Sequence, residues 1–127
     1  MSDREQELIR AFQEHFDAEQ ENNIERTLAT LHPEIVYEHP FREPEPDIEG
    51  IDAVREYYRR HWGAHPFQKI RIVRSWLSGS DTLVTETEAT VGRPGEPVQF
   101  IRNLAIGIFR DGLLIREIVY NGPYVPV

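Results

Sequence analysis

The sequence contains no cysteine, no apolar run long enough to span a membrane and no surplus of basic residues. Without cysteine, disulfide bonds, thiolate metal sites and a cysteine nucleophile are excluded. The charged start at residues 2–5 lacks the apolar core of a signal peptide, and no stretch approaches the length of a membrane span. These absences predict a soluble cytoplasmic protein that has no membrane partner.

Basic residues are scarce, with 14 Lys and Arg against 22 Asp and Glu, so the formal net charge is −8. An acidic surface repels nucleic acids and anionic lipids, so neither is an expected partner. The 127 residues fit one domain over 1–127. A composition with 39% hydrophobic and 10% aromatic residues is typical of a folded globular chain.

Several motifs of catalysis and cofactor binding are also missing. The chain has no glycine-rich phosphate loop and no Ser-His-Asp signature. No two of its five histidines show H-x-H, H-x₃-H or H-E-x-x-H spacing within one predicted element, since His61 and His65, which are four apart, flank Gly63. We therefore expect neither a metal site nor a cofactor.

The first half of the chain shows helical periodicity. Apolar residues recur at spacings of three and four over Asp3–Glu21, Ile24–Leu31 and Ile51–Trp62, which predicts three helices. His32-Pro33 ends the second, because the residue before proline avoids the helical region. The segment Ile35–Glu38 between the second and third helices is predicted as a short strand.

After Gly63 the period changes from helical to two. Alternation between glycine-containing turns predicts four strands: Ile70–Leu77, Leu83–Val91, Val98–Phe109 and Leu113–Tyr120. Alternation in the first places Ile70, Ile72 and Arg74 on one face. The order α-α-β-α-β-β-β-β predicts an α+β fold, with three helices packed on one face of a curved antiparallel sheet.

This order of elements resembles the cone-shaped fold of the nuclear-transport-factor-2-like superfamily, and its SnoaL-like and ketosteroid-isomerase-like branches in particular. The segment His15–His39 aligns without gaps to the first two helices and first strand of the ketosteroid isomerases, and Ile101–Gly122 resembles their last hairpin. The run Glu49–Val54 is similar to a helix start common in SnoaL-like proteins. The resemblance implies a pocket between the helices and the sheet.

The resemblance also implies roles for single residues. His39 falls where the isomerases keep their carboxylate base, and His15 falls where they keep an oxyanion-hole tyrosine. Tyr58 falls on a supporting tyrosine, and Ala105 falls where they keep a protonated aspartic acid. On the last strand, the face that carries Glu117 is implied to line the pocket.

We interpret His39 and Glu117 as the catalytic pair. An imidazole changes charge near neutral pH, which suits a general base, and a buried carboxyl group is a candidate acid. The alternatives are a strand-end His39 that caps a backbone group or lines the pocket, and a Glu117 that forms a structural ion pair with Arg116. His15 is predicted to donate to substrate, or else to be a buried histidine satisfied by Tyr58 or a backbone carbonyl.

Other residues are assigned to substrate binding or to the surface. The substrate-binding set is His15, Tyr58, Asn103, Trp62 and Asn121. Asn103 is two residues from Ala105, so both share one face of their strand. Glu86 and Glu88 are interpreted as a solvated or dimer-forming sheet face, paired with nearby arginines, rather than as a carboxylate pair in the pocket.

The sequence therefore predicts a cofactor-independent acid–base enzyme that acts on a hydrophobic small molecule, with isomerisation, cyclisation, dehydration and epoxide opening all compatible. A non-catalytic small-molecule-binding module is the alternative, and a protein–protein module is a third reading. Leu104, Ile106 and Ile108 share the other face of their strand, and an exposed apolar patch there predicts a homodimer.

Overall fold

A computed structural model describes residues 2–38, 40, 46–61, 67–92 and 94–127. Three helices precede or interrupt the strands: α1 (Asp3–Gln20), α2 (Ile24–Leu28) and α3 (Ile51–His61). The strands are β1 (Leu31–Glu38), β2 (Ile48–Glu49), β3 (Phe67–Ser78), β4 (Thr82–Val91), β5 (Gln99–Arg110), β6 (Leu113–Asn121) and β7 (Val125–Pro126). The three predicted helices and the longer strands are confirmed, except that α2 ends at Leu28, before the predicted end at His32-Pro33. Strands β2 and β7 were not anticipated.

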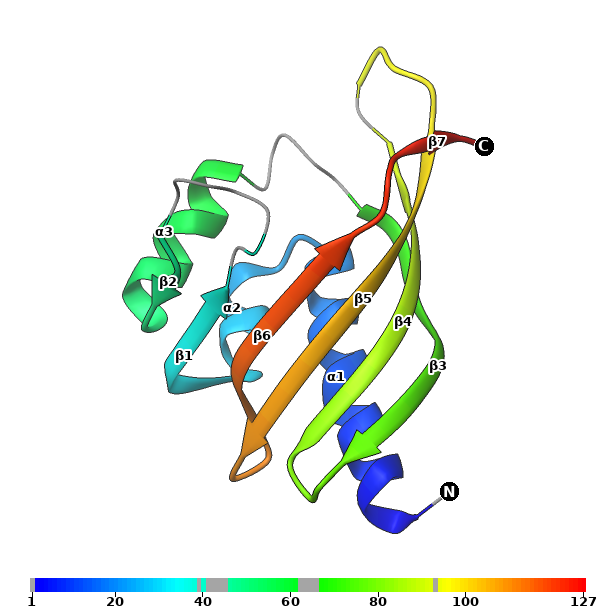
Figure 1. The fold of residues 1–127 in the computed structure, drawn as a ribbon. Helices are drawn as coiled ribbons and strands as arrows, with labels where there is room; N and C mark the ends of the chain where they lie inside the picture. Colours follow the sequence, from blue (N-terminus) through cyan, green and yellow to red (C-terminus); the bar gives the residue numbers. More distant parts are fainter. Residues whose placement is uncertain (1, 39, 41–45, 62–66, 93) are drawn as a thin grey trace.

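The strands form one strongly bent sheet in the order β2-β1-β6-β5-β4-β3, with β7 added to β5. Long hairpins join β3 to β4, β4 to β5 and β5 to β6 in antiparallel pairs. The expectation of an antiparallel sheet is wrong for one pair, because β1 runs parallel to β6. Figure 1 shows α1 lying along one face of the sheet and α3 beyond the β1 edge.

The first helix is fixed at its start by sequence-local chemistry. The Ser2 side chain accepts a hydrogen bond from the Glu5 backbone N–H, which satisfies one of the free donors at the helix start. Asn23 caps α2 in the same way, through the N–H of Arg26. One face of α1 is buried through Leu8, Phe12 and Phe16. This face holds the helix against the sheet and carries His15 inward with it.

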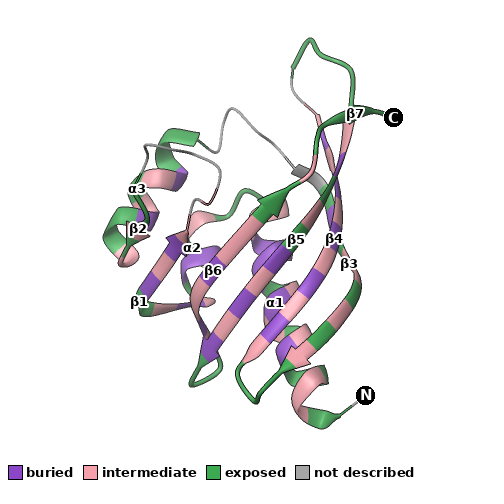
Figure 2. Ribbon diagram, viewed as in Figure 1, coloured by how far each residue is buried: buried purple, intermediate pink, exposed green. Residues whose placement is uncertain are grey.

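The core lies between α1 and the inner face of the sheet, which Figure 2 shows as buried bands on alternate positions of β4, β5 and β6. On β4 every second residue is buried from Leu83 to Val91. On β5 the buried positions include Ala105 and Phe109, while Arg102 and Leu104 are exposed. The predicted parity of this strand is therefore confirmed, and Asn103 lies on the inner face.

Two local expectations differ from the structure. Strand β1 begins at Leu31 rather than at Ile35, and Pro33 lies where its pairing with β6 shifts between Leu31 and Val36. A proline costs no ladder hydrogen bond at such a break. In β3 the register shifts between Ile72 and Arg74. This bulge places Arg74 on the outer face, opposite Glu86, where the arginines that pair with Glu86 and Glu88 are expected, although strict alternation would put it on the face of Ile70 and Ile72.

Across the described part of the chain, no helix is both long and apolar enough to cross a membrane.

Candidate functional site

His15 is the centre of a buried polar cluster on α1. Its side chain is fully buried, with the rings of Phe12, Phe16 and Tyr37 at centroid distances of 6.3, 5.8 and 6.4 Å. A polar ring in such surroundings needs partners for both nitrogens. The predicted partners, Tyr58 or a backbone carbonyl, are not the ones that the structure gives to His15.

The Nδ1 atom of His15 is held by Thr30. The Thr30 hydroxyl donates to the carbonyl oxygen of Thr27 at 2.6 Å, so its proton is already committed. It therefore accepts from His15 Nδ1–H, at 2.8 Å. This contact fixes the ring orientation and leaves Nε2 as the atom that faces the remaining members of the cluster.

Two carboxylates converge on His15 Nε2. Glu19, one turn further along α1, places Oε1 at 2.5 Å, and Glu117 of β6 places Oε2 at 3.5 Å. The side chains of Glu19 and Glu117 are only 14% and 10% exposed, so solvent screens these charges little. Arg116, the alternative partner of Glu117, instead binds Glu38 at 2.5 Å.

The charge of His15 is set by the two carboxylates, against the effect of burial. Burial by itself lowers the pKa of His15, but the charges of Glu19 and Glu117 outweigh it and raise that pKa to about 10. Burial also raises the pKa of Glu19, against the opposing effect of the His15 charge. His15 is therefore an imidazolium at neutral pH, held between two carboxyl groups, and it is a proton donor rather than a base.

The same three side chains offer one nitrogen and two oxygens within 4.8 Å of one another, a grouping that suggests a metal site. Two ligands of a tetrahedral metal ion, each about 2 Å from it, lie about 3.3 Å apart. The separation of His15 Nε2 and Glu19 Oε1 is only 2.5 Å. The two atoms are therefore at the distance of a short hydrogen bond, and they are too close together to be ligands of one metal ion.

We expect the free energy of unfolding to fall as the pH rises through this cluster. A His15 pKa of about 10 in the folded state, against 6.5 as its ordinary value, means that the folded protein holds the proton more tightly. The resulting stabilisation is complete below about pH 6.5 and is lost by about pH 10. The raised pKa of Glu19 also makes the free energy of unfolding fall as the pH rises, and this fall begins above the ordinary pKa of 4.5.

Urea unfolding across this pH range measures the effect, which should total on the order of a few kcal/mol. The matched comparison is His15→Leu, in which most of the slope should vanish. A wild-type stability that is flat or rises between neutral pH and about pH 10 would show that the carboxylates do not hold the His15 proton.

A pair of buried tyrosines adjoins the cluster. The hydroxyls of Tyr37 and Tyr58 hydrogen-bond to each other, and Tyr37 is paired in register with Glu117 across β1 and β6. Burial, reinforced by the charges of Glu19 and Glu117, raises the pKa of both hydroxyls well above the usual value. Both tyrosines therefore stay neutral and keep their protons for donation.

The other predicted site residues fall into three groups. Asn103 faces inward and its Oδ1 is buried with no hydrogen-bond partner. Asn121 is paired with Asn103 in register but is exposed at the end of β6. His39 and Trp62 lie outside the described residues, so the assignment of His39 as a catalytic base and of Trp62 to substrate binding stay predictions.

The carboxylates of β4 lie on the opposite face of the sheet, as predicted. Glu88 accepts hydrogen bonds from Arg102 and Arg71, which hold the pKa of its carboxyl below the usual value. Glu86 lies 2.7 Å from Arg74 and 3.6 Å from Arg102. These charges neutralise one another on the outer face and do not reach His15.

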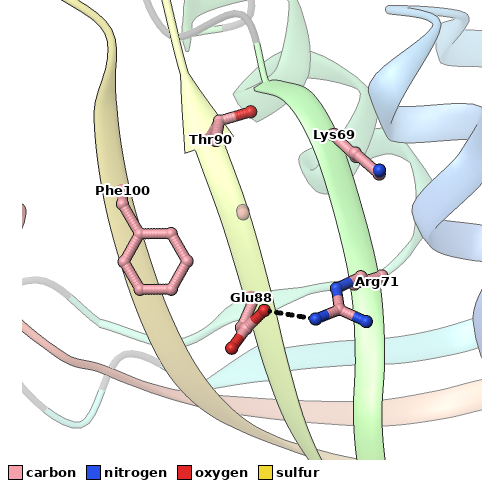
Figure 3. A pocket seen from close by; sticks show the side chains of 6 residues that line it. Lys69, Arg71, Glu88, Thr90 and Phe100 are labelled. Atoms are coloured by element: carbon pink, nitrogen blue, oxygen red, sulfur yellow. Dashed lines mark hydrogen bonds and ion pairs between the residues drawn. The ribbon is translucent and has the colours of Figure 1, made fainter. Parts of the chain in front are cut away.

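An open groove of about 90 Å³ lies beside these ion pairs on β3, β4 and β5. Figure 3 shows Lys69, Arg71, Glu88, Thr90 and Phe100 around it, with Arg71 bonded to Glu88. Arg71 and Glu88 are thus already paired with each other. The groove is separate from the buried cluster and adds nothing to it.

Two members of the site were not anticipated from the sequence. Glu19 is four residues after His15, which places both on one face of α1. Tyr37 lies in the predicted strand Ile35–Glu38, on the same face as Ile35. These spacings were available signals. That Glu117 approaches the same point depends on how β6 packs against α1, which no local pattern contains.

Comparisons with known proteins agree on the architecture. A family model described as a SnoaL-like domain matches residues 12–117. No curated protein gave a significant match.

Solved structures that resemble the chain include an LEH-like epoxide hydrolase of M. tuberculosis (21% identity, TM-score 0.75, 92% of this chain and 84% of that one). A Bacillus subtilis protein has 16% identity and a TM-score of 0.84, over 96% and 91% of the two chains. The Delta 5-3-ketosteroid isomerase of a Mycobacterium species has 18% identity and a TM-score of 0.75, over 90% and 92%. At these identities the likeness shows the fold alone.

Proposed function

Because this chain belongs to the SnoaL-like domain family, we propose that it is a cofactor-independent acid–base enzyme for a hydrophobic small molecule. The observation that carries the proposal is the buried cluster of His15, Glu19 and Glu117 on the inner face of the fold. For stability alone, well-packed apolar residues would serve at least as well as a charged imidazole between two carboxyl groups. Perturbed titratable groups of this kind concentrate where proton transfer takes place.

The geometry supports distinct roles for the members of the cluster. Glu117 is the proton acceptor, because its buried Oε2 has only the long 3.5 Å contact with His15 Nε2 and accepts no closer hydrogen bond among the described residues. His15, as an imidazolium, stabilises negative charge that develops on the substrate. Glu19 keeps His15 charged and oriented from the side of α1. His39 remains the proposed partner of Glu117 in proton transfer. The variant His39→Ala tests this role, because it removes the imidazole.

The substrate panel follows from this chemistry and from the activities named for the structural relatives. It holds a Δ5-3-ketosteroid, an alkyl epoxide and apolar hydroxyketones, all neutral, since a cluster with two carboxylates repels anions. Turnover of at least one class is expected. Saturable binding with no turnover of any class would favour the non-catalytic binding module instead.

We also propose that the protein is a homodimer that buries the outer face of the sheet. Trp76, Leu104 and Tyr120 are 49%, 39% and 39% exposed there. The arginine–glutamate pairs on the same face carry both signs of charge, so the face is complementary to a second copy of itself.

Sedimentation at micromolar concentration should give a species of twice 14.9 kDa. The variant Leu104→Glu should dissociate it, because its carboxylate would be buried opposite that of Glu86, which is its neighbour in register. A wild-type species of 14.9 kDa would contradict the dimer.

A further inference from the structure

The open groove on the outer face of the sheet has cations on one side and an aromatic ring on the other. Figure 3 shows Lys69 and Arg71 of β3 along one side and Phe100 of β5 on the other, with Thr90 of β4 between them. Lys69 is paired with Thr90, and Thr90 with Phe100, so the three lie in one row across the strands. This row spans two strand spacings, which is about 10 Å.

The charges beside the groove do not balance. A continuous row of ion pairs crosses the outer face of β3, β4 and β5, and its members are Arg74, Glu86, Arg102, Glu88 and Arg71. Lys69 lies next to this row and is exposed, and within the described part of the chain no acidic side chain is paired with it. Four cations against two carboxylates leave two positive charges in excess, on a chain whose formal net charge is −8.

The polar side-chain groups that remain free at the groove are mainly hydrogen-bond donors. Both oxygens of Glu88 already accept, one from Arg71 and the other from Arg102. The described hydrogen bond to Glu88 occupies one N–H of the Arg71 guanidinium and leaves the others available. The ammonium group of Lys69 adds further donors. A carboxylate is the anion that suits two neighbouring cations of this kind, because each of its oxygens accepts a charge-assisted hydrogen bond.

The size of the groove limits the rest of the ligand. Its volume of about 90 Å³ is roughly three times the share of one water molecule in the liquid. Sites for drug-sized ligands are several times larger. The space therefore suits one carboxylate and one small apolar body, such as a single ring, which can lie against the ring of Phe100.

We propose that this groove binds a small monocarboxylate with a flat apolar body. The carboxylate lies between Lys69 and Arg71, and the body crosses β4 and rests against Phe100. This site is independent of the proposed function, because it lies on the opposite face of the sheet from Glu117. It also takes the opposite class of ligand, since the inner cluster repels anions.

A second copy of the chain is the other possible occupant of the outer face, but its proposed contact uses a different part of that face. Leu104 is opposite Glu86 on β4 and Tyr120 on β6, and Trp76 is opposite Val84. Four residues separate Leu104 from residue 100 of the groove, which is about 13 Å along the strand at roughly 3.3 Å per residue. The groove is therefore outside the apolar part of the dimer contact.

The test titrates the full chain at low ionic strength with benzoate and with benzamide, which has a similar shape but no charge. Amide chemical shifts in nitrogen-15 NMR follow the binding. Benzoate should saturate the protein with a Kd on the order of 1 mM, as expected of a small ligand in an open groove, and the shifts should centre on residues 69–71, 88–90 and 100. Benzamide should bind about fivefold more weakly. Equal affinities, shifts centred on the inner cluster, or no saturation would overturn the proposal.

Two matched variants test the role of the free cation. Lys69→Met keeps the apolar stem and removes the charge, so benzoate should bind about threefold more weakly while benzamide is unaffected. Arg110→Met removes an exposed cation at the far end of β5 and should leave both affinities unchanged. Thermal unfolding checks that both variants are folded. An affinity for benzoate that Lys69→Met leaves unchanged, or that both variants lower equally, would overturn the assignment of the groove.

The variant Glu117→Gln separates this site from the inner one. It should leave the affinity for benzoate unchanged, because Glu117 lies on the other face of the sheet. A loss of benzoate binding in Glu117→Gln would place the anion at the inner cluster and overturn the groove as its site.

Discussion

Turnover by the variant Glu117→Gln is expected to fall by about a hundredfold or more, on whichever panel molecule the wild type converts. Glutamine has the shape of glutamate but has no basic carboxylate, so the proton acceptor is lost while the packing around His15 is kept. Substrate affinity should change little, because the amide oxygen still accepts a hydrogen bond. The effect should therefore appear in kcat rather than in KM.

The matched control for this variant is Glu86→Gln. Glu86 is also a carboxylate on a central strand, but it faces the outer side and pairs with Arg74. Its replacement should leave turnover within about twofold, since its charge is already paired with Arg74 and lies on the opposite face of the sheet from the site. Comparable losses in Glu117→Gln and Glu86→Gln would mean that the inner carboxylate has no chemical role.

The variant His15→Leu is expected to lose about 3–5 kcal/mol of unfolding free energy at neutral pH. Leucine fills much of the space of the ring, so the loss comes mainly from the charges. Glu19 and Glu117 would face each other in the core without the cation between them. Urea unfolding measures the loss, which should shrink at acid pH, where the carboxyl groups become neutral.

Two further variants show whether charge is the cause. Adding Glu117→Gln to His15→Leu should recover part of the stability, because only one buried carboxylate then remains. Arg26→Met breaks the exposed ion pairs of Arg26 with Glu14 and Glu21, and it should cost less than about 1 kcal/mol. A His15→Leu loss no larger than that of Arg26→Met would refute the buried-charge account.

Much of the fold could be predicted from the sequence, because helices and strands leave regular local patterns of apolar residues. The apolar stripe of α1 and the parity of β5 follow from repeats of 3.6 and two residues. The parallel pairing of β1 with β6 was not within reach, since it joins segments about 80 positions apart and no local pattern marks the direction of such a contact. The bulge before Arg74 was missed because a strict alternation assumes unbroken pairing.

The site was predicted in part for the same reason. Glu117 and His15 stood out as polar residues in apolar stripes, and both are buried in the structure. Their mutual contact, and the part of Glu19 in it, depends on the packing of β6 against α1. The role of Thr30 as the partner of His15 Nδ1 is likewise a tertiary feature. Single residues could be nominated from the sequence, but their partners could not.

The charge on His15 is the property on which the site depends most directly. Nitrogen-15 NMR of the histidine rings, with His15 assigned through its loss in His15→Leu, reports protonation at each ring nitrogen. The structure implies that His15 is an imidazolium at neutral pH and that its pKa is about 10. In Glu19→Gln this pKa should be lower, because one of the two carboxylates is removed. A neutral His15 ring at pH 7, or a pKa that Glu19→Gln leaves unchanged, would contradict the acid–base cluster.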